Sequence, residues 1–199
     1  MNYKLLKRVL DICGSLALLI VILPLFALVA LCVLLFDGRP VFYRRRVVGV
    51  RGEFDAFKFR SMRADADETL ARDSALHAAF SQNFKLRDDP RVTRLGRVLR
   101  RYSLDEFPQL INVLAGQMSL VGPRMITAVE LAKYGEYQRL LLTMKPGLTG
   151  YWQVHGRQEV CYEERVRMDI DYINRWTFGL DCRLLLLTPL RVIHGKGAY

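Results

Sequence analysis

An uncharged apolar run at residues 12–36 is the feature that most constrains how this chain can fold. At about 25 residues the run is long enough for a membrane-spanning helix. A cleaved signal peptide fits poorly, because the run is too long and no small-residue cleavage site follows it. We therefore expect a helix that enters a membrane.

Positive side chains lie on both sides of this run, which conflicts with a simple span. Cytoplasmic segments of membrane proteins are enriched in lysine and arginine, so these charges predict that both ends of the run are cytoplasmic. These residues are Lys4, Lys7 and Arg8 before the run, and Arg39, Arg44, Arg45, Arg46 and Arg51 after it.

Pro24 lies in the middle of the run and can resolve the conflict. Proline removes a backbone donor and clashes with the preceding turn, so the helix is expected to bend or break there. Each half would then have about 12 residues, roughly 18 Å, which is too short for a hydrocarbon core near 30 Å. We predict a re-entrant helix–break–helix over residues 1–38 that enters and leaves on the cytoplasmic face. A kinked spanning helix is the alternative, since transmembrane helices tolerate proline.

The remaining residues, 39–199, are enough for one domain with a modest core. The formal net charge of the 199-residue chain is +10, which favours anionic partners such as nucleic acid, lipid headgroups or phosphorylated substrates. Nucleic acid is disfavoured, because no aromatic platform or known binding motif accompanies the basic segments. The four cysteines form no CxxC pair and the three histidines match no metal spacing, so neither a disulfide framework nor a zinc site is expected.

The pattern of the remaining chain predicts a mainly α fold with a small β-hairpin, an α+β class with interfacial helices and a compact cytosolic domain. Residues 40–62 alternate like two strands with a turn near residues 50–52, although a basic juxtamembrane loop is the alternative. Residues 91–102 repeat arginine every three positions, which indicates an amphipathic helix that either lies on anionic lipid or presents a solvated face. Residues 64–79 and 159–176 are predicted to be helices. Residues 180–193 are predicted to form an interfacial or core segment that Pro189 breaks.

Asp105 and Glu106 are adjacent carboxylates in a stretch otherwise rich in arginine, between Arg100 and Arg124. Paired acids suit a divalent cation, and guanidinium groups suit phosphate oxygens. The pattern therefore indicates a site for a metal–diphosphate substrate, in which one carboxylate attacks phosphorus and the other holds the metal. The alternative is a purely structural role, in which the two acids cap an amphipathic helix.

Pro108 limits where the helix after these acids can begin. Proline is tolerated in the first turn, where its missing donor has no partner within the helix. A start with Asp105 as N-cap satisfies this condition. A start at Ser103 would instead form a capping box with Glu106. Both place the acids at the positive end of a helix.

Several short strings, in their order and spacing along the chain, resemble the bacterial sugar transferases, the small monotopic phosphoglycosyl transferases that act on polyprenyl phosphate. These strings cover residues 7–11, 57–62, 89–96, 103–110, 118–124, 145–150 and 153–157. The chain departs from the family pattern at Met125, where relatives commonly have proline, and at Leu23, where some have serine. Neither departure touches the acid pair.

The resemblance implies transfer of a sugar-1-phosphate from a UDP-sugar to undecaprenyl phosphate, with release of UMP. This reaction is the first membrane step in assembling a surface glycan such as an exopolysaccharide, capsule, O-antigen or glycoprotein. Asp105 would be the nucleophile of a phosphosugar–enzyme intermediate, and Glu106 beside it would hold Mg²⁺. Lys58, Arg100 and Arg124 match the family's phosphate-binding cations. Asp169 matches a further acidic position that contacts metal or sugar.

Such an enzyme is expected on the cytoplasmic face of the bacterial inner membrane, with UDP-sugar, undecaprenyl phosphate and membrane lipids as partners and no nucleic acid. The sequence leaves open which sugar is transferred, which glycan pathway it serves and whether the chain forms a homodimer. Two other functions fit the same acids and charge. One is a membrane-bound metal-dependent phosphatase or nucleotidase, and the other is a non-enzymatic basic membrane adaptor.

Overall fold

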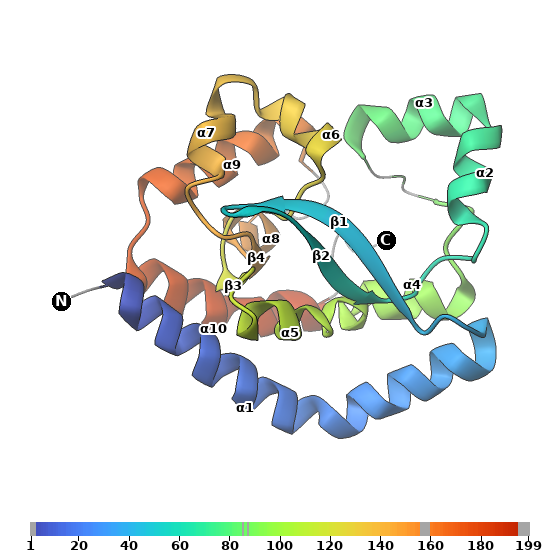
Figure 1. Ribbon diagram of the computed structural model, residues 1–199, viewed down its shortest axis with the longest axis horizontal. Coiled ribbons are helices and arrows are strands. Elements are labelled where there is room, and N and C mark those ends of the chain that lie inside the picture. The colour runs from blue at the N-terminus through green and yellow to red at the C-terminus, as the bar shows by residue number, and fades with distance from the viewer. Residues whose placement is uncertain (1–2, 85, 87, 156–159, 195–199) are drawn as a thin grey trace.

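The structure, a computed structural model, describes residues 3–84, 86, 88–155 and 160–194 (Figure 1). It is mainly helical, as predicted, with one antiparallel and one parallel pair of strands among the described residues. The strands are β1 (Phe42–Gly49), β2 (Gly52–Phe59), β3 (Ser119–Val121) and β4 (Gly147–Thr149). The α-helices are α1 (Tyr3–Cys32), α2 (Ala66–Arg72), α3 (Ser74–Asn83), α4 (Arg94–Arg101), α5 (Gln109–Leu114), α6 (Ala128–Leu131), α7 (Gln138–Leu141), α8 (Tyr151–His155), α9 (Tyr162–Asn174) and α10 (Phe178–His194). A π-helical turn, η1 (Val33–Asp37), and two 3₁₀ helices, η2 (Leu104–Glu106) and η3 (Ala132–Tyr137), complete the order.

The apolar run lies in α1 and η1, and α1 continues through Pro24 as one helix that is bent near its middle (Figure 1). The predicted break at Pro24 is therefore a bend. Proline removes a single backbone donor, and the turns on either side keep their own hydrogen bonds. The helical stretch Tyr3–Asp37 is long and apolar enough to cross a membrane, and only 11% of its most apolar window is buried. Many of its apolar side chains near the bend are exposed, such as Val21, which is 77% exposed.

The predicted hairpin is confirmed, which rules out the loop interpretation of residues 40–62. β1 pairs antiparallel with β2, and Gly49 opposite Gly52 closes a two-residue turn. Gly52 has a φ of 106°, a conformation that glycine adopts without a steric cost. Val47, Phe54 and Ala56 from this hairpin are buried in the main core.

The parallel pairing of β3 with β4 was not foreseen. Ser119 lies opposite Gly147, and Val121 lies opposite Thr149. The backbones of Gly147 in β4 and of Gly122, just after β3, approach very closely. A Cβ on Gly147 would lie only 2.1 Å from the nitrogen of Gly122. This contact fixes the chain just before Arg124, and it explains why glycine occupies both positions.

The predicted helices form with changed limits. The segment 64–79 is split into α2 and α3, because Asp73 leaves the helical conformation and its side chain caps α3. The basic repeat forms α4, which Thr93 caps by accepting from the N–H of Gly96. α10 continues through Pro189, so the predicted interruption there is wrong. As in α1, one missing donor does not end a helix that packs along the domain.

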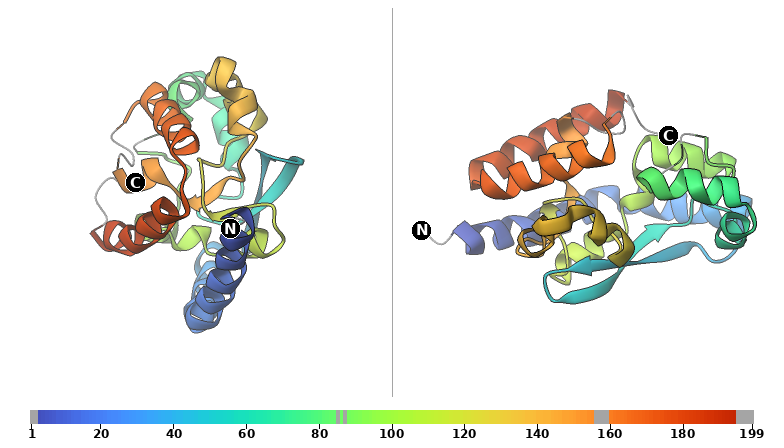
Figure 2. Two further views of the ribbon diagram at one scale, coloured as in Figure 1. Left: turned by 90° about the vertical axis from the view of Figure 1, so that its left-hand side faces the viewer. Right: turned by 90° about the horizontal axis from the view of Figure 1, so that it is seen from above.

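The hairpin lies along one face of the molecule, and most of the helices lie to the other side of it (Figure 2). α1 runs along one side of the molecule beneath α10 and α5, and α2 with α3 lies at the end opposite the N-terminus (Figures 1 and 2). The main core lies between the hairpin, α5, β3, α8, α9 and α10. A smaller apolar cluster joins the C-terminal end of α1 to β2 and α4 through Val29, Val33, Phe59 and Leu99.

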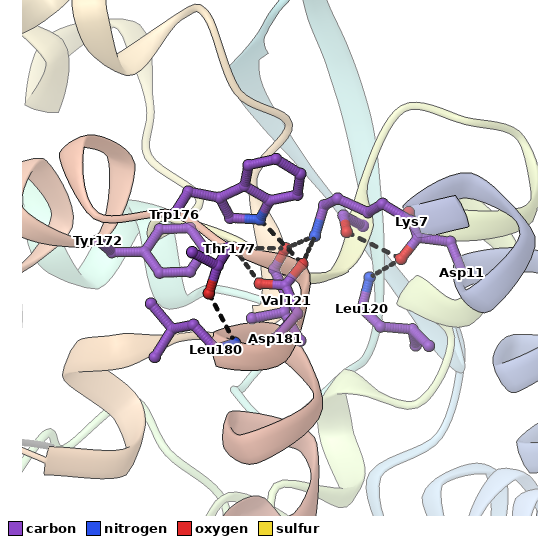
Figure 3. Close-up of polar contacts among 10 residues, drawn as sticks. Lys7, Asp11, Leu120, Val121, Tyr172, Trp176, Thr177, Leu180 and Asp181 are labelled. Atoms are coloured by element: carbon purple, nitrogen blue, oxygen red, sulfur yellow. Dashed lines mark hydrogen bonds and ion pairs between the residues drawn. The ribbon is translucent and has the colours of Figure 1, made fainter. Parts of the chain in front are cut away.

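Polar contacts bind the N-terminal end of α1 to the domain (Figure 3). Lys7 Nζ donates to Asp181 Oδ2 at 2.5 Å and to the Val121 carbonyl at 2.8 Å. Asp181 is fully buried, and its Oδ1 also accepts from the hydroxyl of Tyr172 at 2.6 Å. One helical turn later, Asp11 Oδ1 accepts from the N–H of Leu120 at 2.9 Å. The start of α1 is thereby tied to both β3 and α10.

The C-terminal end of the same helical stretch is bound to the same domain. The Arg60 guanidinium, at the end of β2, donates to the carbonyls of Asp37, Gly38 and Arg39. Asp37 Oδ2 in turn accepts from the Thr93 hydroxyl at 2.9 Å. Both ends of the apolar helix therefore contact one folded unit, while its middle stays exposed.

Candidate active site

The acid pair lies in η2, a single 3₁₀ turn between α4 and α5. Ser103, just before it, has a φ of 54°, which turns the chain sharply away from α4. Neither Asp105 nor Ser103 caps a helix with its side chain, so both predicted cap arrangements are wrong. Pro108 directly precedes α5, because the 3₁₀ turn occupies the positions that a longer helix would have used. The Asp105 side chain is free of any capping role and faces the site.

Lys58 is the cation that directly contacts the pair. Its Nζ lies 2.6 Å from Glu106 Oε1, and the two side chains are 16% and 33% exposed. Asn112 on α5 holds this end of β2 in register, since its side chain accepts from the N–H of Phe57 at 3.0 Å and donates to the Asp55 carbonyl at 2.8 Å. This positioning role of Asn112 was not predicted from the sequence, because asparagine is common in helices and carries no signal of such a contact.

The two carboxyl groups differ in their affinity for a proton. Burial raises the pKa of Asp105, with a further increase from the charge of Glu106, against the opposing effects of Lys58 and Arg100. Burial also opposes ionisation of Glu106, but the ion pair with Lys58, helped by Arg124 and Arg45, outweighs it and lowers the Glu106 pKa. The neighbours thus make Asp105 the more basic of the two carboxylates and favour the ionised form of Glu106.

Arg100 reaches the site from the end of α4. Its Nε donates to the Ser61 hydroxyl at 2.9 Å, and burial lowers its pKa. α4 packs directly on this segment, because a Cβ on Gly96 would lie 2.0 Å from the Ser61 carbonyl oxygen. The charge of Arg100 acts on Asp105, although no ion pair joins these two described side chains.

Arg124 is held in place through its backbone and through its side chain. Its N–H lies 3.2 Å from each carboxylate oxygen of Asp169, and its guanidinium lies 4.9 Å from the centre of the Trp152 ring. Arg165 also lies over this ring, with 4.8 Å between its guanidinium and the ring centre. Trp152 and Arg165 were not singled out in the sequence, because only folding brings α8 and α9 against Arg124.

Asp169 lies behind Arg124 rather than in the site. It is fully buried, does not line the cavity described below, and accepts from the Tyr134 hydroxyl at 2.7 Å. These contacts give it a positioning role. Its direct contact with metal or sugar stays a prediction.

We expect Asp169→Asn to change how stability depends on pH. Burial raises the Asp169 pKa from 3.8 to about 6, although Tyr134 and Arg124 act in the opposite direction. Because the folded pKa is the higher one, the stability from this group is complete below pH 3.8 and is lost as pH rises through about 6. The loss amounts to about 3 kcal/mol for a shift of this size. Urea unfolding at pH 4 and pH 7 should therefore show a smaller decrease for Asp169→Asn than for the unmodified chain, and equal decreases would contradict the assignment.

A cavity of about 1750 Å³ connects the charged site to the apolar helix. Its polar wall contains Lys58, Arg100, Asp105, Glu106 and Arg124, so the structure brings five of the six predicted site residues of the domain together. Its apolar wall includes residues of α1 and α10. The predicted string at 153–157 begins on α8, where Gln153 lines the cavity, but Gly156 and Arg157 lie outside the described residues.

The chemistry of the acid pair suits a magnesium ion shared with substrate phosphates, and this cofactor stays a prediction. Mg²⁺ usually keeps water and binds one or two carboxylates together with substrate phosphates. The described residues contain no group of three Asp, Glu, His or Cys side chains placed to hold a metal, so a resident site made by the protein alone is not indicated. Lys58 engages Oε1 of Glu106, which leaves Oε2 and the Asp105 carboxylate as candidate ligands.

Comparison with known proteins agrees with this geometry. The family model described as "Bacterial sugar transferase" matches residues 2–195. The chain is 43% identical to the undecaprenyl-phosphate galactose phosphotransferase of Salmonella typhimurium over 98% of this chain and 42% of that protein. It is 40% identical to the UDP-glucose:undecaprenyl-phosphate glucose-1-phosphate transferase of Xanthomonas campestris over 88% of this chain and 36% of that protein.

These two relatives are more than twice as long as the matched region, so the chain spans less than half of each. A relative of similar length also matches. The exopolysaccharide production protein ExoY of Sinorhizobium fredii is 39% identical over 97% of this chain and 88% of its own length. Both the nearly complete family match and this full-length relative confirm the resemblance found in the sequence. The chain belongs to the bacterial sugar transferase family.

Proposed function

We propose that this chain transfers a sugar-1-phosphate from a UDP-sugar to undecaprenyl phosphate, as an early step of surface glycan assembly. The observation that carries the proposal is one cavity with two different walls. One wall presents a buried carboxylate beside an acid–lysine pair and two arginines, and the other is apolar and belongs partly to the exposed helix α1. A diphosphate and a polyprenyl chain need these two surfaces side by side. The names of the relatives in Salmonella and Xanthomonas support the same acceptor.

In the first step, an Asp105 carboxylate oxygen attacks the phosphorus that carries the sugar. A bond forms between that oxygen and phosphorus, and the bond from phosphorus to the bridging oxygen of UMP breaks, so UMP leaves with the electron pair. Lys58 and Arg100 offset the repulsion between the carboxylate and the diphosphate, and Arg124 adds positive charge. When bound by Asp105 and Glu106, Mg²⁺ would supply further neutralisation of the phosphate charge.

In the second step, a phosphate oxygen of undecaprenyl phosphate attacks the same phosphorus. A new diphosphate bond forms, the bond to Asp105 breaks, and the carboxylate is regenerated. The raised pKa of Asp105 suits the first step, because a more basic carboxylate is a better nucleophile. No proton has to move in either step, since each nucleophile attacks as an anion.

The transferase proposal is tested by adding the purified full chain to UDP-sugars with and without undecaprenyl phosphate. Formation of lipid-linked sugar that requires the acceptor, together with UMP, is the expected result. Phosphate release without acceptor would favour a phosphatase or nucleotidase. No turnover of any donor, in a chain that still binds membranes, would favour a basic adaptor. A panel of UDP-hexoses and UDP-N-acetylhexosamines identifies the sugar.

The proposal places both ends of α1 on the cytoplasmic face of the inner membrane, with residues 1–38 re-entrant and residues 39–199 catalytic. Lys7 and Asp11 at one end, and Arg60 with the carbonyls of residues 37–39 at the other, bind the same domain. A span with ends on opposite faces would have to break one of these sets of contacts. The exposed bend would then be the part that enters the lipid.

We expect neither end of α1 to react with a membrane-impermeant maleimide added outside intact inner membranes. The test replaces the native cysteines by serine and introduces Lys4→Cys in the first turn of α1 or Arg39→Cys after η1, both at exposed positions. Each cysteine should react only after the membrane is opened. External labelling of one of the two positions would show a spanning helix instead.

A further inference from the structure

Arg45 lies on β1 and lines the cavity that holds the acid pair. The strand register pairs Arg45 with Ala56 and Tyr43 with Lys58, and alternate residues of a strand point to the same face. Arg45 therefore shares a face of the hairpin with Lys58. In the sequence, Arg45 is one of several positive charges that follow the membrane segment. The fold separates it from its neighbour Arg44, which is exposed, packs over the Phe57 ring and does not line the cavity.

A buried carboxylate holds Arg45 against the cavity wall. Glu130 is fully buried, and its Oε2 lies 2.8 Å from Arg45 Nη2, while the Arg45 side chain is 24% exposed. The same oxygen accepts from the N–H of Thr127 at 2.9 Å, in the capping box that begins α6. Because Glu130 is fixed by the start of a helix, the guanidinium is ordered before any ligand arrives, which reduces the entropy lost on binding.

Most of the Arg45 donors remain free. Among the described residues, Glu130 is the one hydrogen-bond acceptor of the Arg45 side chain, and Nε and Nη1 are not enclosed. Lys58, by contrast, is engaged by Glu106, and Arg100 uses its Nε on Ser61. The geometry of guanidinium suits phosphate oxygens, which it binds through two parallel N–H groups.

We propose that Arg45 is a further phosphate-binding residue of this cavity and that Glu130 positions it. The inference rests on the proposed function, which brings phosphate to this cavity from two sources, the donor diphosphate and the lipid phosphate. A guanidinium on the same face as Lys58 would share the charge of the diphosphate with Lys58, Arg100 and Arg124. Its contact with substrate would be direct, and that of Glu130 would be indirect.

The test measures binding of UDP with Mg²⁺ by titration calorimetry, using the full chain in detergent. Arg45→Met should weaken UDP binding about tenfold to a hundredfold, the loss typical of a hydrogen bond to a charged group. Arg45→Lys should recover part of the loss. Arg44→Met removes the same charge from the adjacent residue on the same strand, and it should bind UDP as the unmodified chain does. Because Arg45→Met leaves Glu130 buried without its partner, Arg45→Met with Glu130→Gln is measured as well, with the same loss expected.

A second arm measures the KM for undecaprenyl phosphate in the same variants. Weaker UDP binding supports the inference with the donor as the source of phosphate. An increased acceptor KM with unchanged UDP binding supports it with the lipid phosphate as the source. If both quantities are unchanged in the folded double variant, or if Arg44→Met loses as much as Arg45→Met, the inference is overturned. A chain that binds UDP through Arg45 but makes no lipid-linked sugar would contradict the proposed transfer and leave this site standing.

Discussion

Asp105→Asn should abolish transfer to undecaprenyl phosphate, with a decrease of more than about a thousandfold in kcat. The amide has the shape of the carboxylate, but its oxygen is a far weaker nucleophile toward phosphorus. The variant should still bind UDP, since removal of a buried negative charge beside a diphosphate lessens repulsion. The measurement is radiolabelled lipid product per enzyme, with Asp65→Asn as the control. Asp65 is a surface carboxylate that pairs with Arg63 and does not line the cavity.

The same experiment examines the covalent step directly. Incubation of the unmodified chain with UDP-sugar and Mg²⁺, without acceptor, should add the mass of one sugar phosphate to the peptide that contains Asp105. Asp105→Asn should show no such adduct. Normal transfer by Asp105→Asn, or an adduct that maps to another residue, would contradict the mechanism. Loss of transfer together with loss of UDP binding would point to a structural effect of the substitution.

Lys7→Met should lower the free energy of unfolding by about 3–5 kcal/mol, the cost of leaving a buried ion without its partner. Asp181 is fully buried and would keep the hydroxyl of Tyr172 and the indole N–H of Trp176, but no positive charge within ion-pair distance among the described residues (Figure 3). The Val121 carbonyl would lose its donor as well. Unfolding of the chain in detergent micelles by urea measures the effect.

Lys4→Met provides the matched control, because Lys4 is exposed one turn earlier on the same helix. It should leave stability within about 0.5 kcal/mol of the unmodified chain. Removal of both charges in Lys7→Met with Asp181→Leu should cost less than the sum of the two single changes, since neither ion is then left unpaired. Additive losses, or equal behaviour of Lys7→Met and Lys4→Met, would show that the pair does not hold α1 to the domain.

How well the sequence predicted each structural element depends on how short a stretch of residues carries the signal for it. The hairpin was predicted because alternation and a glycine turn act within neighbouring residues. A long apolar helical segment near the N-terminus was predicted because hydropathy is summed along one segment. The proline interruptions were predicted too strongly. The loss of one donor is a local cost, because the turns on either side of each proline keep their own hydrogen bonds.

The acid pair, Lys58 and the two arginines were found through motif order, and folding then brought them to one cavity. Motif order could not predict where Asp169 and Arg45 lie relative to the cavity. Asp169 acts on Arg124 from α9, 45 residues away, and the relation between Arg45 and Glu130 spans 85 residues. No period or spacing links such residues, because their partners are set by packing of separate elements.

The sequence by itself determined the long apolar helix, the hairpin and the family, since each depends on short-range pattern or on motif order. Only the tertiary structure decided that β3 pairs with β4, that both ends of α1 bind one domain, and that Arg45 faces the cavity while Asp169 lies behind it. Three-residue strands and single long-range ion pairs carry almost no local signal. Their energies arise only when distant segments exclude water from a shared surface.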